Sequence, residues 1–586
     1  MNILGISAFY HDSAACLIQD GKVVACAQEE RFTGKKHDLF FPKNAIESCL
    51  QQGKISVKDV DYVGFYEKPF IKFERILYTY LATFPRSLPS FLKAIPLWLK
   101  EKIWIPQTIR KELDYQGDIL MIEHHLSHAA STFLVSPFSE AAILTIDGVG
   151  EWATATYGIG KENQIEIFKE LKFPHSLGLL YNAFTYYLGF QVNSDEYKVM
   201  GLAPYGKPVY YDSIMKELVS LKDDGSFQLN MKYFAYDYGL KMTNANFEKL
   251  FSLPVRNSSE PIQKKHQDLA ASIQKVTEEI MLKMANFLYQ QTNLKNLCLA
   301  GGVALNCVAN GRILRETQFK NIFIQPAAGD AGGAVGVAAY IYHSLLNNPR
   351  NFVWENAYFG PEHSDSQIKK FLQQNQISFK EYSPDELIKY TAKLLAEDKV
   401  IGWFQDRMEF GPRALGNRSI LADPRNPENK DRVNKKIKFR EEFRPFAPVI
   451  LEEKVSEYFE INCPSPYMLL VAQVKPEKKD KIPAVVHIDG SARIQTVNRK
   501  QNALIYDLLK EFEKLSACPV LLNTSFNLKG EPIVCTPQDA YLTFIRSGLD
   551  YLIMGNCVLD KKEMKTQETP VQTDATKELE KTVTIR

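Results

Sequence analysis

Three segments that pass from an apolar run into a glycine-rich turn constrain the fold of this sequence most strongly. They read AILTIDGVGEWATATYGIG (142–160), NLCLAGGVALNCVANGRI (296–313) and IQPAAGDAGGAVGVAAYIYHSLL (324–346). The first ends a strand at Asp147, and the third places Asp330 directly before a helix of small residues. Glycine-rich turns at strand ends and helix starts direct backbone N–H groups toward anions. The segments therefore predict strands that end in turns able to approach a phosphate or a nucleotide closely.

The chain of 586 residues is too long for one hydrophobic core and indicates about two to four folding units. The polar run NNPRNFVWENAYFGPEHSDS follows the glycine-rich region, so we place a domain boundary near residue 355. We predict one lobe over 1–355 and a second over 356–560. The last residues, 561–586, are rich in Lys, Glu and Thr, which predicts a flexible tail.

Short elements can be predicted in both lobes. NILGIS predicts a first strand, and Asp20-Gly21 lies between two β-rich runs, which is the signal of a two-residue hairpin. In the second lobe we predict helices over 366–375 and 385–397 and strands at VIGWFQ and YLIMGN.

The overall charge argues against nucleic-acid and membrane partners. Lys plus Arg (71) nearly balances Asp plus Glu (69), and a net charge of +2 gives no global field to attract a polyanion or an anionic membrane. The most apolar stretch, PSFLKAIPLWLKEKIWIP, is interrupted by Lys93, Lys100, Lys102 and prolines and cannot span a bilayer. We interpret it as an amphipathic cap or a substrate lid.

The cysteines indicate a reducing compartment. There are nine of them, widely spread, with no Cys-x-x-Cys pair, and several lie inside apolar runs such as NLCLAGG. The N-terminus MNILGISAFYHD has no basic segment followed by a long apolar one, so we see no signal peptide and expect a cytoplasmic protein.

Two histidines and two aspartates form a candidate metal site. His124 and His128 in EHHLSHAA are four residues apart, so on a helix they share one face, whereas His125 points elsewhere as a packing residue or a donor to a ligand. Together with Asp147 and Asp330 they suit Fe(II), Mn(II) or Zn(II). Since both carboxylates lie in glycine-rich turns, we expect the ion to touch a phosphate.

A cluster of basic residues marks the second lobe. Arg413 and Arg418 occur in MEFGPRALGNRSI, and KIKFREEFRPFAP adds Lys438, Arg440 and Arg444 among apolar neighbours. Guanidinium groups match phosphate oxygens in bidentate pairs. We therefore predict an anion site, to which Arg493 and the polar turn LNTSFN, with Asn523 and Ser525, add further groups; the alternative is salt bridging to Glu441, Glu442 or Asp423.

Long motifs resemble one enzyme family over nearly the whole chain except the tail. SAFYHDSAA, QEERF, EHHLSHAAS, DGVGEW, NSDEYKVMGLAPYG, LAGGVALNC and GDAGGA are similar to the O-carbamoyltransferases related to nodulation protein U, cephem carbamoyltransferase and tobramycin carbamoyltransferase. The resemblance implies an α/β protein of two α+β lobes. The first would be an actin-like ATPase or sugar-kinase-type lobe, and the second a threonylcarbamoyl-adenylate-synthase-like lobe.

The resemblance also implies roles for particular residues. The metal positions match His124, His128, Asp147 and Asp330. The nucleotide loop matches Gly302 and Asn306, and the turn residues Asp147, Gly148 and Asp330 lie beside it. The second lobe would bind carbamoyl phosphate and ATP, with Arg413, Lys438, Arg444, Arg493 and Asn523 on the matching positions.

His11 and Asp12 follow the first strand, beside where phosphates lie in this fold type. A neutral imidazole can take the proton of an acceptor hydroxyl, so His11 is the candidate general base, with a structural turn histidine as the alternative. Asp12 and Lys36 are candidates for binding the acceptor, and Lys36 could equally be a solvated lysine.

The expected reaction is ATP-dependent transfer of a carbamoyl group from carbamoyl phosphate, through carbamoyl adenylate, to a hydroxyl of a small natural-product acceptor. Iron(II) is the first choice of metal, with Mn(II) or Zn(II) as alternatives and Mg(II) accompanying ATP. The rivals are tRNA threonylcarbamoyl transfer, a small-molecule kinase and a non-enzymatic actin-like switch. The identity of the acceptor and the oligomeric state, a homodimer included, stay open.

Overall fold

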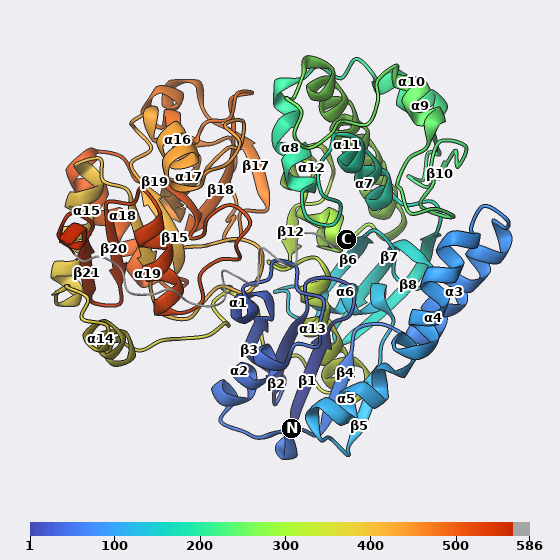
Figure 1. Ribbon diagram of the computed structural model, residues 1–586, viewed down its shortest axis with the longest axis horizontal. Helices are drawn as coiled ribbons and strands as arrows, with labels where there is room; N and C mark the ends of the chain where they lie inside the picture. Colours follow the sequence, from blue (N-terminus) through green and yellow to red (C-terminus); the bar gives the residue numbers. More distant parts are fainter. Residues whose placement is uncertain (567–586) are drawn as a thin grey trace.

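The computed structural model describes residues 1–566 and shows two lobes side by side (Figure 1). One hydrophobic core runs from Ile3 to Trp354, and a second runs from Ile368 to Met564. A few side chains of the second lobe, among them Phe410 and Tyr467, pack into the first core. The lobes are therefore joined by apolar packing as well as by the chain.

The first lobe contains two five-stranded sheets of the same topology. One has the order β3-β2-β1-β4-β5 and the other β12-β11-β6-β7-β8. In each, three antiparallel strands are followed by two parallel ones. The strands are β1 (Asn2–Ser7), β2 (Ala14–Gln19), β3 (Lys22–Gln28), β4 (Tyr62–Phe65), β5 (Asp118–Met121), β6 (Glu140–Ile146), β7 (Ala153–Lys161), β8 (Gln164–Lys172), β11 (Asn296–Ala300) and β12 (Asn321–Ile324). This duplication confirms the expected actin-like, sugar-kinase-type lobe.

Two helices lie between the sheets and set the geometry of the site. Helix α13 (Asp330–Ala339) packs on β1 and on α6 (His124–Phe133), which in turn covers β6 and β11. The contacts are close because glycines stand at them. A Cβ on Gly5 would lie 1.9 Å from the Ala334 carbonyl oxygen, and one on Gly336 would lie 1.8 Å from the Ser127 carbonyl oxygen. The small residues of α13 thus hold Asp330 beside α6.

Other helices and two short strands complete the first lobe. They are α1 (Glu30–Thr33), α2 (Lys43–Gly53), α3 (Pro69–Ala82), α4 (Leu88–Lys100), α5 (Ile105–Leu113), α7 (Leu177–Tyr187), α8 (Glu196–Leu202), α9 (Tyr211–Glu217), β9 (Val219–Leu221), β10 (Phe227–Leu229), α10 (Ala245–Phe251), α11 (Lys264–Thr292) and α12 (Cys307–Glu316). The predicted hairpin is confirmed between β2 and β3, where Asp20 (φ 47°) and Gly21 (φ 81°) are both left-handed.

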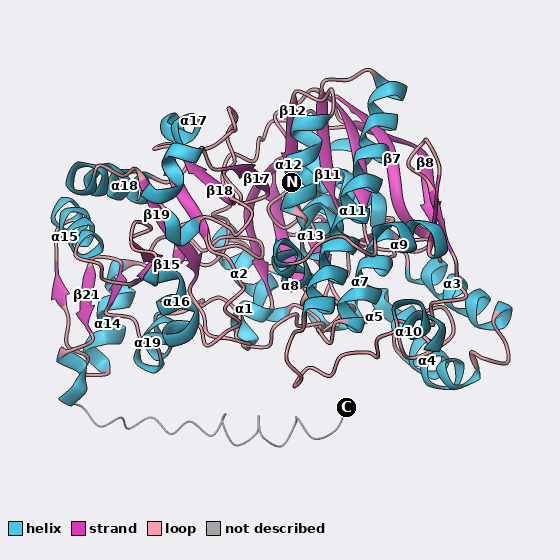
Figure 2. Ribbon diagram, turned by 90° about the horizontal axis from the view of Figure 1, so that it is seen from above, coloured by secondary structure: helices cyan, strands magenta, loops and turns pink. Residues whose placement is uncertain are grey.

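The second lobe is built on one nine-stranded sheet of order β13-β21-β20-β14-β15-β19-β16-β18-β17 (Figure 2). Its strands are β13 (Lys380–Glu381), β14 (Ile401–Phe404), β15 (Arg418–Ala422), β16 (Ala447–Leu451), β17 (Leu470–Gln473), β18 (Ser491–Val497), β19 (Val520–Ser525), β20 (Tyr551–Met554) and β21 (Cys557–Asp560). Its helices are α14 (Asp365–Gln374), α15 (Pro384–Ala396), α16 (Glu428–Arg432), α17 (Val455–Tyr458), α18 (Ala503–Ser516) and α19 (Pro537–Arg546). The predicted helices near 366 and 385 and the strands at VIGWFQ and YLIMGN are confirmed as α14, α15, β14 and β20.

Most of the expected tail, 567–586, lies outside the described residues. Within the described part, the Lys561 ammonium donates to the carbonyl oxygens of Phe544 and Ile545, and Met564 is buried in the second core. The packed chain therefore extends past residue 561. Among the described residues, no helix is both long enough and apolar enough to cross a bilayer.

Candidate functional site

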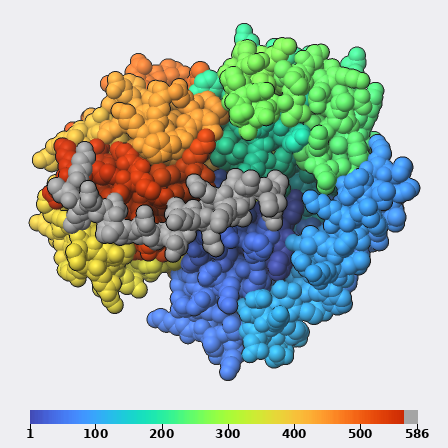
Figure 3. Space-filling model, in the orientation of Figure 1, coloured from blue at the N-terminus to red at the C-terminus, as the bar shows by residue number. Residues whose placement is uncertain are grey.

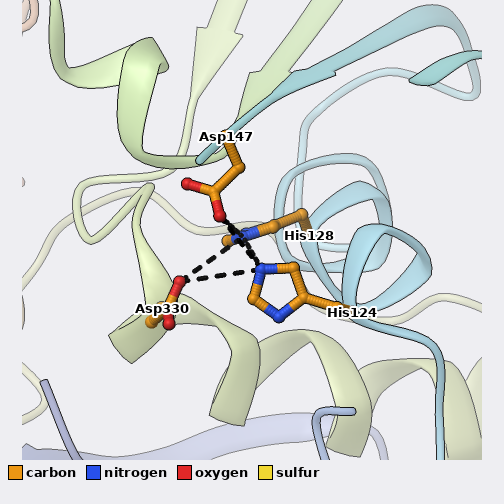
Figure 4. Close-up of side chains that lie close together, drawn as sticks. All are labelled: His124, His128, Asp147 and Asp330. Carbon is orange, nitrogen blue, oxygen red and sulfur yellow. Dashed lines mark hydrogen bonds and ion pairs between the residues drawn. The ribbon is translucent and has the colours of Figure 1, made fainter. Parts of the chain in front are cut away.

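The two predicted histidines and two predicted aspartates meet at one point in the first lobe (Figure 4). His124 and His128 lie on one face of α6, one turn apart, as their spacing predicts. Asp147 directly follows β6, and Asp330 is the first residue of α13. One ligand atom of each residue lies within 4.8 Å of the others. Residues distant in the sequence thus form a cluster that we call the His–Asp cluster.

The spacing of these atoms fits a bound divalent ion. His124 Nε2 lies 3.1 Å from His128 Nε2, 3.1 Å from Asp147 Oδ2 and 3.7 Å from Asp330 Oδ1. Ligands about 2.1 Å from a metal ion are separated from one another by roughly 3 to 4 Å. Two imidazole nitrogens and two carboxylate oxygens suit Fe(II), Mn(II) or Zn(II). The donor set therefore fits a divalent ion of the predicted kind.

The electrostatics also favour a cation. Burial acts to lower the pKa of His124, but Asp330 and Asp147 outweigh it and raise the pKa to about 9. Burial and the neighbouring His124 hold the pKa of His128 well below its usual value, so this ring is neutral. Burial raises the pKa of Asp330 despite His11 and His124. The four side chains of the His–Asp cluster are largely buried and offer several acceptor atoms, and a bound divalent cation would provide these atoms with a partner.

His125 turns away from the His–Asp cluster. Its Nδ1 lies 2.6 Å from the hydroxyl of Thr145, and burial lowers its pKa to about 3. It is a buried, neutral residue that packs against Thr145 of β6.

The His11 loop borders the same cluster. His11 Nδ1 lies 2.9 Å from Asp12 Oδ2, and its Nε2 lies 3.8 Å from Asp330 Oδ2. Burial acts to lower the pKa of His11, but Asp330 and Asp12 outweigh it and raise that pKa well above its usual value. Asp12 also lies 2.7 Å from His37 Nδ1. The loop therefore presents an imidazole whose orientation a carboxylate fixes.

The glycine-rich turns surround the cluster as predicted. The Gly302 N–H donates to Asp147 Oδ1 over 2.8 Å, so this carboxylate links the turn to His124. Asn306 caps the N-terminus of α12, where its Oδ1 accepts from the Ala309 N–H, and its amide nitrogen lies 3.1 Å from Gln274 Oε1. Gly148, Gly302 and Asn306 all line one cavity next to Asp147 and Asp330.

That cavity, of about 610 Å³, extends from the His–Asp cluster into the second lobe. Its wall in the first lobe includes His11, Asp12, Lys36, Asp147 and Asp330. Its wall in the second lobe includes the basic side chains Arg413, Lys438, Arg440, Arg444 and Arg493, which we call the cationic cluster, together with Asn523 and Ser525. Residues predicted for two different sites therefore line a single chamber.

The members of the cationic cluster repel one another. Burial, Arg440 and Arg444 hold the pKa of Lys438 well below its usual value, although its ammonium donates to Ser525 and to Asn527 Oδ1 at 2.7 Å. Burial and Arg493 lower the pKa of Arg413 to about 9, and its buried Nε has no hydrogen-bond partner among the described residues. An anion in the chamber would relieve both effects.

Arg418 does not belong to this cluster, contrary to the sequence prediction. It begins β15, is fully buried, and donates to the backbone carbonyl oxygens of Gln405, Asn417 and Asp406. Its guanidinium also lies 3.7 Å from the centre of the Phe404 ring, and it does not line the chamber. Arg418 therefore holds a loop in place, because strand register directs its side chain away from the cavity.

Tyr197 was not singled out from the sequence and links the lobes. The Arg444 guanidinium lies 4.8 Å from its ring centre, and the Lys36 ammonium lies 5.5 Å from it. Both basic groups line the chamber, so the Lys36 side chain is not a purely solvated one. The signal was present in the motif NSDEYKVMGLAPYG, but only the tertiary structure shows which of its residues faces the cavity.

The two sheets of the same topology place this chain among proteins built on a duplicated actin-like lobe. Residues 2–339 match the family description "Carbamoyltransferase N-terminus", and residues 392–561 match "Carbamoyltransferase C-terminus". The chain belongs to the carbamoyltransferase family, as its motifs indicated, and is an enzyme of carbamoyl transfer.

Relatives of similar length support this assignment. The chain is 52% identical over 601 residues to the uncharacterized protein sll1178 of Synechocystis sp., covering 97% of this chain and 98% of that one. It is 37% identical over 569 residues to nodulation protein NolNO of Sinorhizobium fredii, covering 96% and 81%. Among solved structures, T. kodakarensis HypF superposes with a TM-score of 0.31 at 14% identity, covering 59% of this chain and 48% of that one, which is too limited to bear on function.

Proposed function

We propose that this carbamoyltransferase uses ATP to move the carbamoyl group of carbamoyl phosphate, through carbamoyl adenylate, to a hydroxyl of a small-molecule acceptor. The observation that carries the proposal is the single chamber lined by both the cationic cluster and the His–Asp cluster. Free carbamate is short-lived in water, and an enclosed path between two reaction centres protects such an intermediate.

The first half-reaction belongs to the cationic cluster. Hydrolysis of carbamoyl phosphate releases phosphate and leaves carbamate, whose oxygen attacks the α-phosphorus of ATP and expels pyrophosphate. Arg413, Arg444 and Arg493 would pair with the phosphate oxygens of both substrates, since guanidinium forks bind them in bidentate fashion. Lys438 is held by Ser525 and Asn527, and an anion bound in the chamber would favour its protonated form.

The second half-reaction belongs to the His–Asp cluster. The acceptor hydroxyl attacks the carbamoyl carbon, its proton passes to His11 Nε2, and the bond to the adenylate oxygen breaks to release AMP. Asp12 holds the opposite nitrogen of His11 at 2.9 Å and so fixes the ring with Nε2 toward the cluster. The carboxylate of Asp330 is the main influence that favours the protonated ring, so ligation of Asp330 to a cation would favour the neutral base.

The metal site that we propose consists of His124, His128, Asp147 and Asp330. Iron(II) is our first choice, with Mn(II) or Zn(II) as alternatives, because the donor set has two nitrogens and two oxygens and lacks thiolate. A divalent ion bound there supplies a positive charge for the phosphate of the adenylate. Mg(II) would accompany ATP.

The acceptor that we propose is a small-molecule alcohol rather than a nucleic acid, and the compartment that we propose is the cytoplasm. The near balance of charges, 71 basic against 69 acidic residues, gives no overall positive field to attract a polyphosphate backbone. A shift assay with tRNA should show no stable complex at physiological salt.

The test supplies the metal-loaded enzyme with carbamoyl phosphate, ATP and a panel of alcohols, and follows AMP, pyrophosphate and the mass of each alcohol. We expect AMP and pyrophosphate in equal amounts and a mass gain of one carbamoyl group. Arg444→Met should abolish pyrophosphate release, whereas His11→Asn should leave adenylate formed but not transferred. Arg499→Met, at an exposed pair with Asp507, is the matched control. Equal loss of both steps in the Arg444 and His11 variants would refute the division of labour.

A further inference from the structure

Helices α3 and α4 form a hairpin at the edge of the first lobe, on the side away from the second lobe (Figure 1, Figure 2). Figure 3 shows this segment, in blue, projecting at the margin of the molecule. The hairpin is held by ring contacts between its helices, Phe73 with Trp98 and Tyr80 with Phe91. The sequence left open whether this segment is a cap or a lid.

The outer side of this hairpin is apolar. In α4, Leu88, Leu92 and Leu99 lie at spacings that place them on one helical face, and all are exposed. Tyr78 and Leu81 extend the patch along α3, and Phe84 extends it across the turn. Side chains of this patch, which we call the α3–α4 face, are 43 to 66% exposed: Tyr78, Leu81, Phe84, Leu88, Leu92 and Leu99. Apolar patches of this kind mark interaction surfaces.

The exposed side borders the side that packs on the protein. Ser90 and Ile95 of α4 are buried, and the Ser90 hydroxyl donates to the Tyr238 carbonyl oxygen. Arg75 of α3 is buried with its guanidinium over the Phe173 ring. Leu88, Leu92 and Leu99 belong to neither hydrophobic core of the described residues, although Ile95 on the same helical face is buried. A helix that is apolar on both sides indicates a second apolar environment.

The turn between the helices and α4 carry charges of one sign, although Glu74 lies in α3 and Glu101 directly follows α4. Between residues 76 and 100 the chain contains Arg86, Lys93 and Lys100 and no Asp or Glu. All three are exposed, and Lys93 and Lys100 make no ion pair among residues 1–566. On α4, Lys93 and Lys100 stand one position from the leucine stripe, which is the pattern of helices that lie in a membrane interface. The net charge of +2 concealed this local excess, because it averages over the whole chain.

A second copy of this chain suits the face less well. In a two-fold dimer the same patch meets itself, so the lysines of both copies would lie at one apolar interface. Like charges brought together in that way oppose association. A surface of negative lipid headgroups offers the opposite charge to the lysines and an apolar layer to the leucines.

We propose that the α3–α4 face docks this enzyme on the surface of an anionic lipid bilayer. The leucines and Phe84 enter the boundary between headgroups and acyl chains, and Lys93 and Lys100 pair with lipid phosphates. The protein lies on the bilayer and does not cross it, consistent with the lack of a spanning helix among the described residues. This inference is independent of the proposed adenylate route.

The test measures binding of the full chain to sedimented vesicles. One set consists of phosphatidylcholine alone, and the other of equal parts of phosphatidylcholine and phosphatidylglycerol. We expect binding to the anionic vesicles that weakens as salt is added. Each basic group near such a surface strengthens binding about fivefold, so Lys93→Gln with Lys100→Gln should weaken it about 25-fold. Leu81→Gln with Leu92→Gln should weaken it by about tenfold or more.

Matched control variants distinguish binding through the α3–α4 face from nonspecific binding of the protein to vesicles. Leu345→Gln with Leu515→Gln removes two leucines of similar exposure elsewhere, and Lys370→Gln with Lys481→Gln removes two exposed lysines of the second lobe. Neither pair should change vesicle binding. Circular dichroism and thermal unfolding establish that every variant is folded. The AMP and pyrophosphate assay then reports on the proposed reaction separately.

Tryptophan fluorescence gives a second readout. Trp104, directly after the hairpin, is 47% exposed, whereas Trp354 and Trp403 are fully buried. Insertion should shift the emission to shorter wavelength, and Trp104→Phe should reduce that shift. Equal binding of the control and face variants, or equal binding to both vesicle types, would overturn the proposal. A dimer that is lost in the Leu81 and Leu92 variant would also overturn it, in favour of a second copy.

Discussion

The His–Asp cluster and the cationic cluster line one chamber but differ in how their charges are balanced. In the first, four ligand atoms lie within 4.8 Å, and carboxylates face imidazoles. In the second, basic groups face one another, and burial and basic neighbours lower the pKa values of four of them: Arg413, Lys438, Arg440 and Arg493. The first cluster offers acceptors to a cation, and the second offers donors to an anion. The comparison teaches that each cluster is completed by a ligand of opposite charge.

The largest expected effect is on the His–Asp cluster. Asp330→Asn removes a charged ligand, and we expect loss of bound metal and a fall in carbamoyl transfer of about 1000-fold, or about 4 kcal/mol. Metal content by mass spectrometry and the rate of acceptor modification check it. His125→Gln, on the same helix but bonded to Thr145, should keep the metal. Full metal content in the Asp330 variant would break the comparison.

The next effect is on the cationic cluster. Arg413→Met removes a guanidinium that lines the chamber, and we expect ATP–pyrophosphate exchange with carbamoyl phosphate to fall about 100-fold, or about 2.7 kcal/mol. Arg418→Met is the informative contrast, because its guanidinium holds backbone carbonyls outside the chamber. It should lower the melting temperature more than the exchange rate per folded molecule. A larger loss of exchange rate than of melting temperature in the Arg418 variant would show that Arg418 belongs to the anion site.

The pH dependence of stability should differ in sign between the clusters. In chelator-treated protein, the pKa of His124 is higher in the folded state than in the unfolded chain, where it is 6.5. Protonated His124 therefore stabilises the fold at pH values below 6.5, and this stabilisation is lost as the pH rises toward 9. We expect a loss of about 1 to 3 kcal/mol over that window, absent in His124→Gln. The lowered pKa of Lys438 acts oppositely, so stability relative to Lys438→Met should rise as pH approaches 10.5. Chemical denaturation across this pH range measures both.

The smallest effect concerns the ligand-free stability of the cationic cluster. Arg413→Met relieves repulsion by Arg493, and we expect a gain of about 1 kcal/mol, or about 2 to 4 °C in melting temperature. Carbamoyl phosphate should raise the melting temperature of the natural enzyme more than that of the variant. A lower melting temperature of the Arg413→Met protein would contradict this expectation, because it would show that other groups already compensate the charge of Arg413 in the ligand-free protein.

Much of the local structure could be predicted from the sequence. Asp20-Gly21 specified the hairpin because a two-residue turn needs left-handed backbone at both positions, and both have it. The spacing of His124 and His128 specified a shared helical face, and the glycine-rich turns located Asp147 and Asp330 at element ends. These features depend on neighbours within a few residues, so the sequence contains their whole physical cause.

Side-chain direction in the second lobe could not be predicted in that way. Arg413 and Arg418 lie five residues apart in one glycine-punctuated loop, yet only Arg413 lines the chamber. Arg418 pairs opposite Phe404 in the register between β14 and β15, and that register directs its guanidinium toward the loop carbonyls. The exposed side of α4 could not be predicted either, because the sequence of an apolar helix does not show which of its apolar residues pack on the protein.

The sequence by itself determined the family, the residue types of both clusters and, through the resemblance of its motifs, the actin-like type of the first lobe. The tertiary structure alone decided that Asp330 meets His124 across about two hundred residues of chain, through the glycine contacts of α13. It also decided which basic residues share a cavity and which side of α4 is left exposed. These outcomes depend on long-range packing, in which a side chain's surroundings come from elements distant in the sequence.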